Sequence, residues 1–340
     1  MIYKFNNIFQ KEVFNLPIIN ENDDFESSLN KRYDEYVSLL KENEFSDTKE
    51  IEKICENIID SIRLYHNGFP HKAFYKIKEV MKEQIEKPLK IYKKNMREGE
   101  FFIGGDPLKL FRIRKIEDIN KKYGIEDIFH VPYNQREKIS STRYSILGYP
   151  SLYLSTSLEL CKYELYKPEL ERGHYMVSQF LIERNIKEKE VKINVLELAI
   201  KPQDFFDNKR DERFDEVDLD KVKIEYFNWY PIILACSFVR KNKKDPFASE
   251  YIIPQLIMQY LRYYYEDKKT LMGIRYFSCA SEGASKLGFN YVFPVSGKKV
   301  KGKEFCNILA ETFKISQPKV LEFGSEEECM KDVTSDLKIK

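Results

Sequence analysis

Two arginines, a tyrosine and a glutamate lie between positions 129 and 167, and their side chains suit a ligand that carries both phosphate and sugar. Arg136 and Arg143 are joined by a segment rich in serine and threonine, and Tyr153 and Glu164 follow. Guanidinium groups bind phosphate oxygens in a bidentate manner, and an aromatic ring stacks on a planar group. A carboxylate beside a ribose polarises its hydroxyls and stabilises positive charge on the sugar. Either arginine taken alone is also typical of a salt bridge to a surface acid. The prediction of a ligand site therefore depends on the two arginines together with the tyrosine and the glutamate.

The local pattern predicts that Tyr153 lies on a strand. Residues 151–155 follow Pro150 and alternate apolar side chains with polar or aromatic ones, as a short β-strand does. Because successive side chains of a strand point to opposite faces, Leu152 and Leu154 share one face and Tyr153 points to the other.

The following segment predicts a helix that carries Glu164. Thr156 and Glu159 have the spacing of a capping box, so we expect the helix to begin there and to end near Pro168. Its apolar stripe is expected to comprise Leu158, Cys161 and Leu165. Helical periodicity places Glu164 beside this stripe and Glu159 toward solvent. A carboxylate next to buried surface requires a partner or a catalytic role.

A third arginine, Arg112, belongs to a strand predicted over residues 108–113. A glycine-rich turn at 104–107 precedes this strand and marks the start of a second domain. Arg112 alternates with apolar residues and therefore faces away from their side of the strand. On this pattern alone, Arg112 is equally an edge-strand arginine paired with Glu117 or Asp118.

The order of several short motifs resembles the RES domain family, which is named after an arginine, a glutamate and a serine. The motifs are Phe111-Arg112-Ile113-Arg114, Phe129-His130-Val131-Pro132, Arg143-Tyr144-Ser145, Gly148, Pro150, Leu152-Tyr153-Leu154, Glu164 and Gly273-Ile274-Arg275-Tyr276-Phe277-Ser278. The resemblance runs from about Leu110 to Pro294 and depends on the combination, because each motif alone is weak. It implies a fold similar to that of ADP-ribosylating toxins and NAD+ as the substrate.

The resemblance also implies roles for individual side chains. Arg112 and Arg143 would bind the phosphates of NAD+, and Tyr153 would stack on its nicotinamide side. Glu164 would act on the ribose next to the bond that breaks.

Ser278 matches the serine of the family, and Ser281 is the competing position if the register shifts. A serine without a nearby general base is a poor nucleophile, so Ser278 is assigned a hydrogen bond to the amide or ribose. The predicted catalytic residues are Glu164, Arg143 and Ser278; the predicted NAD+-binding residues are Arg112, Arg143, Tyr153 and Ser278. No metal ion is predicted.

The composition limits the class of protein without naming a function. The 340 residues suffice for one or two domains, and 57 basic against 55 acidic side chains leave a net charge of +2. Such a balance makes nucleic acid an improbable partner and gives no attraction to a membrane surface. Six scattered cysteines without a CxxC pair predict free thiols in a reducing compartment. With no signal-like N-terminus and no membrane-length apolar run, we expect a cytoplasmic protein.

The predicted fold class is α+β, with an N-terminal helical region followed by a mixed-sheet domain. Residues 1–100 are predicted to form helices, and the resemblance makes residues 101–300 a RES domain that is similar to ADP-ribosyltransferases. Residues 301–340 are expected to form a closing segment and tail. Apolar residues at helical spacing predict helices over 27–43 and 47–67 in the first region.

These observations predict an NAD+-cleaving toxin of a toxin–antitoxin or defence system. The ADP-ribose acceptor stays open among water, phosphate and a protein side chain. An antitoxin protein and a second copy of the chain are the expected partners besides NAD+. Two alternatives stay open: a non-catalytic nucleotide-binding or interaction module, and an RNA-processing protein that acts through aromatic side chains of the helical half.

Overall fold

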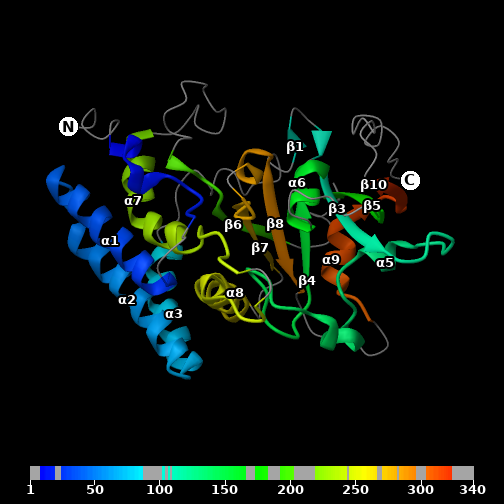
Figure 1. Cartoon of the computed structure of the whole chain (residues 1–340), viewed down its shortest axis with the longest axis horizontal. Coiled ribbons are helices and arrows are strands. Elements are labelled where there is room, and N and C mark those ends of the chain that lie inside the picture. Colours follow the sequence, from blue (N-terminus) through cyan, green and yellow to red (C-terminus); the bar gives the residue numbers. More distant parts are fainter. Residues whose placement is uncertain are drawn as a thin grey trace. The chain divides into compact units, whose positions relative to one another are not determined.

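The computed structural model divides the chain into two compact units, which are described separately (Figure 1). The helical unit comprises 1–96, 141–146 and 199–264, and the sheet unit comprises 97–140, 147–198 and 265–340. The structure describes residues 8–19, 24–86, 102–103, 106–107, 109–165, 173–182, 192–202, 219–242, 245–265, 270–281, 283–295 and 304–323. Mixed acids and bases predict a solvated loop or helix face over 204–220. The part of it up to residue 218 and the tail after 323 lie outside these ranges. The predicted boundaries at 100 and 300 remain predictions.

Five described α-helices form most of the helical unit: α1 (Phe25–Glu42), α2 (Thr48–His66), α3 (Pro70–Glu86), α7 (Leu219–Ala235) and α8 (Ile252–Tyr265). Helix α1 begins where the Asp24 carboxylate accepts a hydrogen bond from the Ser27 amide at 3.0 Å. Helix α2 buries its apolar side chains at helical spacing and ends before Gly68, whose φ of +82° favours glycine. The predicted helices over 27–43 and 47–67 are confirmed within a few residues.

Tyrosine hydroxyls satisfy backbone groups in the core of the helical unit. Pro231 lies inside α7 and has no amide hydrogen, so the Phe227 carbonyl four residues earlier lacks its usual helical donor. The Tyr36 hydroxyl of α1 donates to this carbonyl at 2.7 Å, and Tyr33 donates to the Pro231 carbonyl at 2.8 Å. The core of this unit therefore includes buried polar contacts that helical periodicity does not reveal.

A mixed sheet forms the centre of the sheet unit. Its strand order is β10-β5-β3-β4-β8-β7-β6, and β9 pairs with β5. The bounds are β3 Lys109–Ile116, β4 Ser151–Ser155, β5 Gly173–Ile182, β6 Lys192–Leu198, β7 Thr270–Phe277, β8 Phe289–Pro294, β9 Phe313–Ile315 and β10 Lys319–Phe323. Among these strands β6 and β7 pair in parallel and the others pair antiparallel, which confirms the predicted α+β class with a helical region and a mixed sheet.

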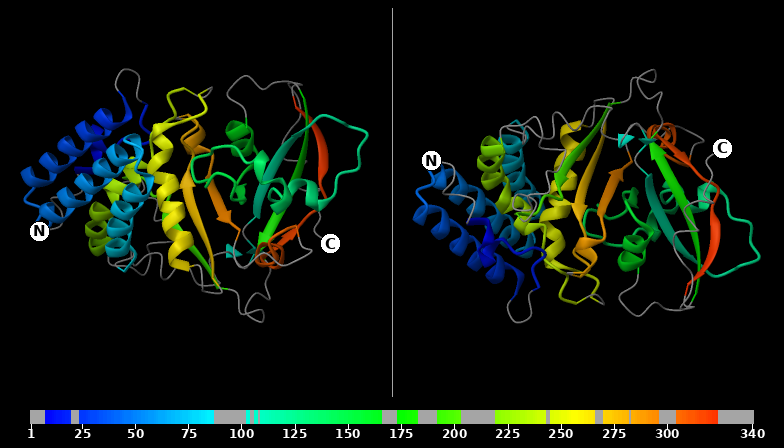
Figure 2. Two further views of the ribbon diagram at one scale, coloured as in Figure 1. Left: turned by 90° about the horizontal axis from the view of Figure 1, so that it is seen from below. Right: turned by 90° about the horizontal axis from the view of Figure 1, so that it is seen from above.

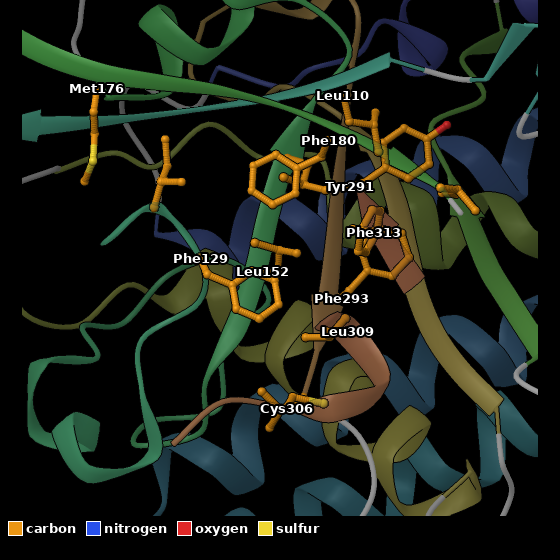
Figure 3. Close-up of a cluster of buried hydrophobic side chains, with 14 of the residues drawn as sticks. Leu110, Phe129, Leu152, Met176, Phe180, Tyr291, Phe293, Cys306, Leu309 and Phe313 are labelled. Atoms are coloured by element: carbon orange, nitrogen blue, oxygen red, sulfur yellow. The ribbon is translucent and has the colours of Figure 1, made fainter. Parts of the chain in front are cut away.

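Each face of the sheet has its own apolar cluster. Figure 2 shows the strands of this sheet in two further views. One cluster joins Leu110, Leu152 and Phe180 to Ile128 of α5 (Ile125–Ile128) and Leu309 of α9 (Asn307–Thr312). Figure 3 shows Leu110, Leu152, Phe180 and Leu309 gathered with Phe293 and Phe313. The other cluster joins the alternate residues of β3 and β5 to helix α6 (Leu158–Leu165). The α6 face and the opposite, α9 face are therefore distinguished by which residues of β3 project there.

His130 is buried on the α9 side, and its hydrogen bonds define its neutral form. Its Nδ1 donates to the Val131 carbonyl at 2.8 Å, and its Nε2 accepts from the Cys306 amide at 2.9 Å. Burial lowers the pKa of His130 from 6.5 to about 4, and the positive charge of Arg112 acts in the same direction. Protonation would place a hydrogen on Nε2 and break the bond to Cys306.

We therefore expect acid to destabilise the fold through His130. The unfolded chain binds a proton near pH 6.5 and the folded chain only near pH 4, so stability is complete above pH 6.5 and is lost as the pH falls toward 4. The full loss is about 3 kcal/mol. Urea unfolding at a series of pH values measures it, and His130→Gln should flatten the slope between pH 6.5 and 4. A slope equal to that of the wild type would contradict this assignment.

Candidate active site

Helix α6 presents Glu164 at its C-terminal end. The helix is held at its start by Ser157, whose Oγ accepts from the Leu160 amide at 3.1 Å. The predicted capping box at Thr156 was therefore wrong, because Thr156 Oγ1 instead accepts from the Phe289 amide of β8 at 2.9 Å. Gly288 permits this approach, since a Cβ there would lie 2.3 Å from Thr156 Oγ1.

The buried side of α6 differs from the predicted stripe at two positions, Leu160 and Leu165. Leu158, Leu160 and Cys161 are buried, and Leu158 and Cys161 pack in the apolar cluster with β3 and β5. Leu165 is 43% exposed, because it is the last residue of the helix. Glu164 is exposed as a residue and Glu159 faces solvent as predicted.

A hydrogen-bonded chain of polar side chains fixes the Glu164 carboxylate. Asn290 of β8 is 2% exposed, and its Nδ2 donates to Glu164 Oε1 at 2.6 Å. The Oδ1 of the same amide accepts from the hydroxyl of Ser155, its cross-strand partner on β4. Ser155 also hydrogen-bonds Cys161, whose thiol donates to the Phe111 carbonyl at 3.4 Å. Glu164 is thus held against the sheet although one side of it remains open to solvent.

Arg112 is a partly buried cation that has no paired carboxylate among the described residues. The residue retains some exposure, but its Nη1 is buried and has no hydrogen-bond partner among the described residues. Burial, and to a smaller extent the neighbouring charge of Arg114, lower the pKa of Arg112 from its ordinary value to about 10. Tyr153 and Cys161 are close enough to favour its charge electrostatically, but both are weak acids. The site therefore has excess positive charge beside Tyr153.

Strand pairing relates these residues to the two faces of the sheet. Strands β3 and β4 are both described in full, and their ladder consists of the single pair Phe111–Ser155. Paired residues share a face, so Tyr153 projects with Ser155 toward α6 and Arg112 leaves β3 from the α9 face. The β3–β4 ladder does not extend to Arg112, so the backbone of Arg112 does not pair with β4. Arg112 therefore leaves the sheet from the face opposite to that of Tyr153 and Glu164, although Arg112 and Glu164 both act electrostatically on Cys161.

Arg143 belongs to the helical unit and has hydrogen-bond partners there. Its Nη1 donates to the Cys236 carbonyl at 3.0 Å and its Nη2 to the Phe238 carbonyl at 2.8 Å. Its guanidinium carbon lies 5.0 Å from the centre of the Tyr251 ring, and the residue is 8% exposed. These contacts join the loop at 141–146 to the end of α7. The phosphate-binding and catalytic roles assigned to Arg143 remain predictions.

The two candidate serines both stabilise turns after β7. Ser278 is fully buried, and its Oγ accepts from the Ala280 amide at 3.1 Å. Ser281 is half-buried, and its Oγ accepts from the Ala284 amide at 3.1 Å. The ligand contact assigned to Ser278 remains a prediction.

Asn290 and Ser155 are the site residues that the sequence patterns did not single out. Asn290 interrupts the otherwise apolar strand Phe289–Pro294, and a polar residue at a buried strand position requires a hydrogen-bond partner. That signal was available, but the partner was not, because Glu164 lies 126 residues away along the chain.

We expect Asn290→Ala to lower the turnover of the reaction proposed below about tenfold to a hundredfold with little change in KM. The carboxylate would lose the donor that orients it, and small misplacements have effects of this size. The loss should disappear in the Glu164→Gln background, because a positioning residue acts only through its partner. Steady-state kinetics of the single and double variants measure this. Additive losses would show that Asn290 acts on the fold instead.

Other kinds of site have little support in the part of the chain that is described. There, no three histidine, cysteine, aspartate or glutamate side chains are grouped so as to hold a metal ion. None of the described helices combines the length and apolar character needed to cross a bilayer. Cys55, Cys161, Cys236, Cys279 and Cys306 are buried free thiols, as predicted, and Cys329 lies outside the described ranges.

Comparison with known proteins identifies one relevant likeness. The chain is 30% identical over 315 residues to a Bacillus subtilis (strain 168) protein named "Putative toxin YopC". The alignment covers 87% of this chain and 66% of that protein, so the chain spans just under two thirds of the length of its relative. No family model matches the chain, so the RES domain remains a prediction. No solved structure matches the chain.

Proposed function

We propose that this protein is a toxin that cleaves NAD+ at the bond between nicotinamide and ribose. The observation that carries the proposal is the Glu164 carboxylate, which Asn290 orients and which acts electrostatically on Cys161, as Arg112 does. Nη1 of Arg112 is buried without a hydrogen-bond partner among the described residues. A negative charge near the sugar and a positive charge for the diphosphate are the two requirements of this substrate. The similarity to a protein named as a toxin supports the biological role.

The chemistry assigned to the site is departure of nicotinamide from an oxocarbenium-like ribose. The electrons of the C–N bond go to the nicotinamide nitrogen, and the sugar carbon becomes positively charged. Glu164 would accept a hydrogen bond from a ribose hydroxyl and stabilise that charge. Arg112 would bind the diphosphate and Tyr153 would stack on the nicotinamide side.

Three acceptors complete the reaction in different ways. Water gives ADP-ribose and a proton, phosphate gives a phosphorylated ADP-ribose, and a protein side chain gives a modified protein and a proton. A toxin of this kind would consume a cofactor or modify a target in its host. We expect a neutralising protein to keep it inactive until it is needed.

Incubation of the purified full chain with NAD+ tests the proposal. Nicotinamide is followed by chromatography with no addition, with inorganic phosphate and with bacterial cell extract. Release in buffer alone identifies hydrolysis, and release that depends on phosphate or extract identifies the other two acceptors. No release from folded protein under any of the three conditions would overturn the proposal and favour a binding module.

One observation favours RNA as a second candidate substrate. In the helical unit Phe69, Tyr75 and Tyr263 are exposed. Lys72 lies 4.6 Å from the centre of the Phe69 ring, and Lys78 lies 4.2 Å from that of Tyr263. Exposed rings with adjacent lysines are the groups on which single-stranded nucleic acid stacks. Incubation with labelled single-stranded RNA, without NAD+, distinguishes the two candidates by cleavage of the RNA.

A further inference from the structure

Two buried polar atoms without partners belong to residues that pair across neighbouring strands and project from the α9 face of the sheet. They are Nη1 of Arg112 and Oγ of Ser178, neither of which has a hydrogen-bond partner among the described residues. Arg112 on β3 and Ser178 on β5 are direct cross-strand partners. Paired residues project from the same face with their Cβ atoms about 5 Å apart. The two donors can therefore reach one common acceptor.

Some comparable side chains have hydrogen bonds, although the described residues include other buried atoms without a hydrogen-bond partner, such as Oγ of Ser151. Arg114, two residues along the same strand, donates to the Asp127 carbonyl at 2.7 Å. Ser61 is also fully buried, and its hydroxyl donates to the Ala73 carbonyl at 3.0 Å. Since buried polar groups are nearly always satisfied, two adjacent exceptions require an explanation. An absent ligand that accepts hydrogen bonds explains both.

The charges around this pair define the ligand as an anion. The positive charge of Arg114 disfavours the charged form of Arg112. Among the described residues, the groups that favour its charged form are the weak acids Tyr153 and Cys161. His130, which interacts electrostatically with Arg112, is neutral above pH 4. A buried cation in such surroundings is stabilised by an external negative charge. A hydroxyl beside it adds a directed donor, and an oxyanion with several oxygens uses both.

We propose that Arg112 and Ser178 form one subsite for a phosphate-type oxyanion, with the Ser178 hydroxyl donating beside the guanidinium. The identity of the ligand rests on the proposed function, which supplies two sources of this chemistry. One is the diphosphate of NAD+ and the other is free phosphate as the acceptor. Binding of the oxyanion itself follows from the two unsatisfied donors whatever reaction the site catalyses.

The subsite makes an unusual prediction for Ser178→Ala. Removing an unsatisfied buried hydroxyl should leave the thermal midpoint of the free protein unchanged or raise it. The same change should weaken the binding of pyrophosphate about fivefold to tenfold, because one charge-assisted hydrogen bond is lost. Calorimetric titration with pyrophosphate at constant ionic strength measures the affinity, and thermal unfolding without ligand measures the stability.

Two further variants serve as controls. Arg112→Met should abolish pyrophosphate binding, since it removes the charge as well as the donor. Ser61→Ala should lower the thermal midpoint, because it breaks a satisfied hydrogen bond, and should leave pyrophosphate affinity unchanged. Ser178→Ala with wild-type affinity, a lowered midpoint of the free Ser178→Ala protein, or a wild type that does not bind pyrophosphate would each overturn the inference.

Nicotinamide release from the same preparations separates this inference from the proposed function. Release by the wild type with no effect of Ser178→Ala on pyrophosphate affinity would leave the function standing and reject the subsite. Pyrophosphate binding that depends on both Arg112 and Ser178, without release of nicotinamide, would support the subsite and reject the proposed function. If the subsite holds the diphosphate of NAD+, inorganic phosphate should inhibit release competitively. If it holds the acceptor, phosphate should accelerate release and Ser178→Ala should raise the KM for phosphate.

Discussion

Glu164→Gln is expected to reduce nicotinamide release at least about a hundredfold while NAD+ binding changes little. Glutamine has the shape of glutamate, and its side-chain oxygen can still accept the hydrogen bond from Asn290 Nδ2. Only the negative charge is removed, and that charge is needed most when the ribose becomes positive. Loss of one preorganised electrostatic contact commonly costs about a hundredfold to a thousandfold in turnover. Because the effect arises in the transition state, kcat should fall and KM should stay near its wild-type value.

A matched control is available on the same helix. Glu159 is exposed and faces solvent at the start of α6, so Glu159→Gln changes the net charge by the same amount without touching the site. Steady-state release of nicotinamide and calorimetric binding of NAD+ should be measured for both variants. Wild-type turnover in Glu164→Gln would remove the central carboxylate from the mechanism. Equal losses in both variants would point to a general effect of charge.

Arg143→Met is expected to lower the free energy of unfolding by about 3 kcal/mol, the sum for buried carbonyls left unsatisfied. The guanidinium donates to the carbonyls of Cys236 and Phe238 and stacks on Tyr251, and a methionine replaces only the apolar part of these contacts. Trp229 is the single tryptophan of the chain and is buried in α7, within the same unit. Urea unfolding followed by its fluorescence therefore reports on the part of the protein that loses the contacts.

Arg136→Met is the comparison for this variant. Arg136 is exposed, with its guanidinium carbon 5.4 Å from the centre of the Tyr133 ring, so its replacement should change stability by less than about 1 kcal/mol. The same preparations should be titrated with NAD+. If Arg143→Met keeps the stability of the wild type and binds NAD+ tenfold more weakly, the structural role is wrong and the phosphate role predicted from the sequence is right.

The elements of this fold were predictable wherever a local pattern sets them. Strand β4 covers Ser151–Ser155, the range that alternation predicts, because the period of side chains along a strand does not depend on its neighbours. Helices α1 and α2 follow the spacing of their buried residues for the same reason. The α+β class follows from the order of these elements. The sequence also singled out Glu164 and Arg112 as the charged residues around which the candidate site is built.

The partners of the polar side chains were decided only by the tertiary structure. Thr156 and Ser157 are both able to cap a helix, and Ser157 does so because the Phe289 amide of β8 occupies Thr156. Glu164 meets Asn290, from 126 residues away, through the register of β4 with β8.

Arg143 illustrates the same limit in the other unit, where it binds carbonyls 93 and 95 residues further along the chain. Hydrophobic periodicity is a local property, and the sequence by itself determined the helices and strands that follow from it. A guanidinium or an amide has many equivalent partners in the sequence, and its choice among them depends on which distant backbone the folded chain brings within hydrogen-bonding distance.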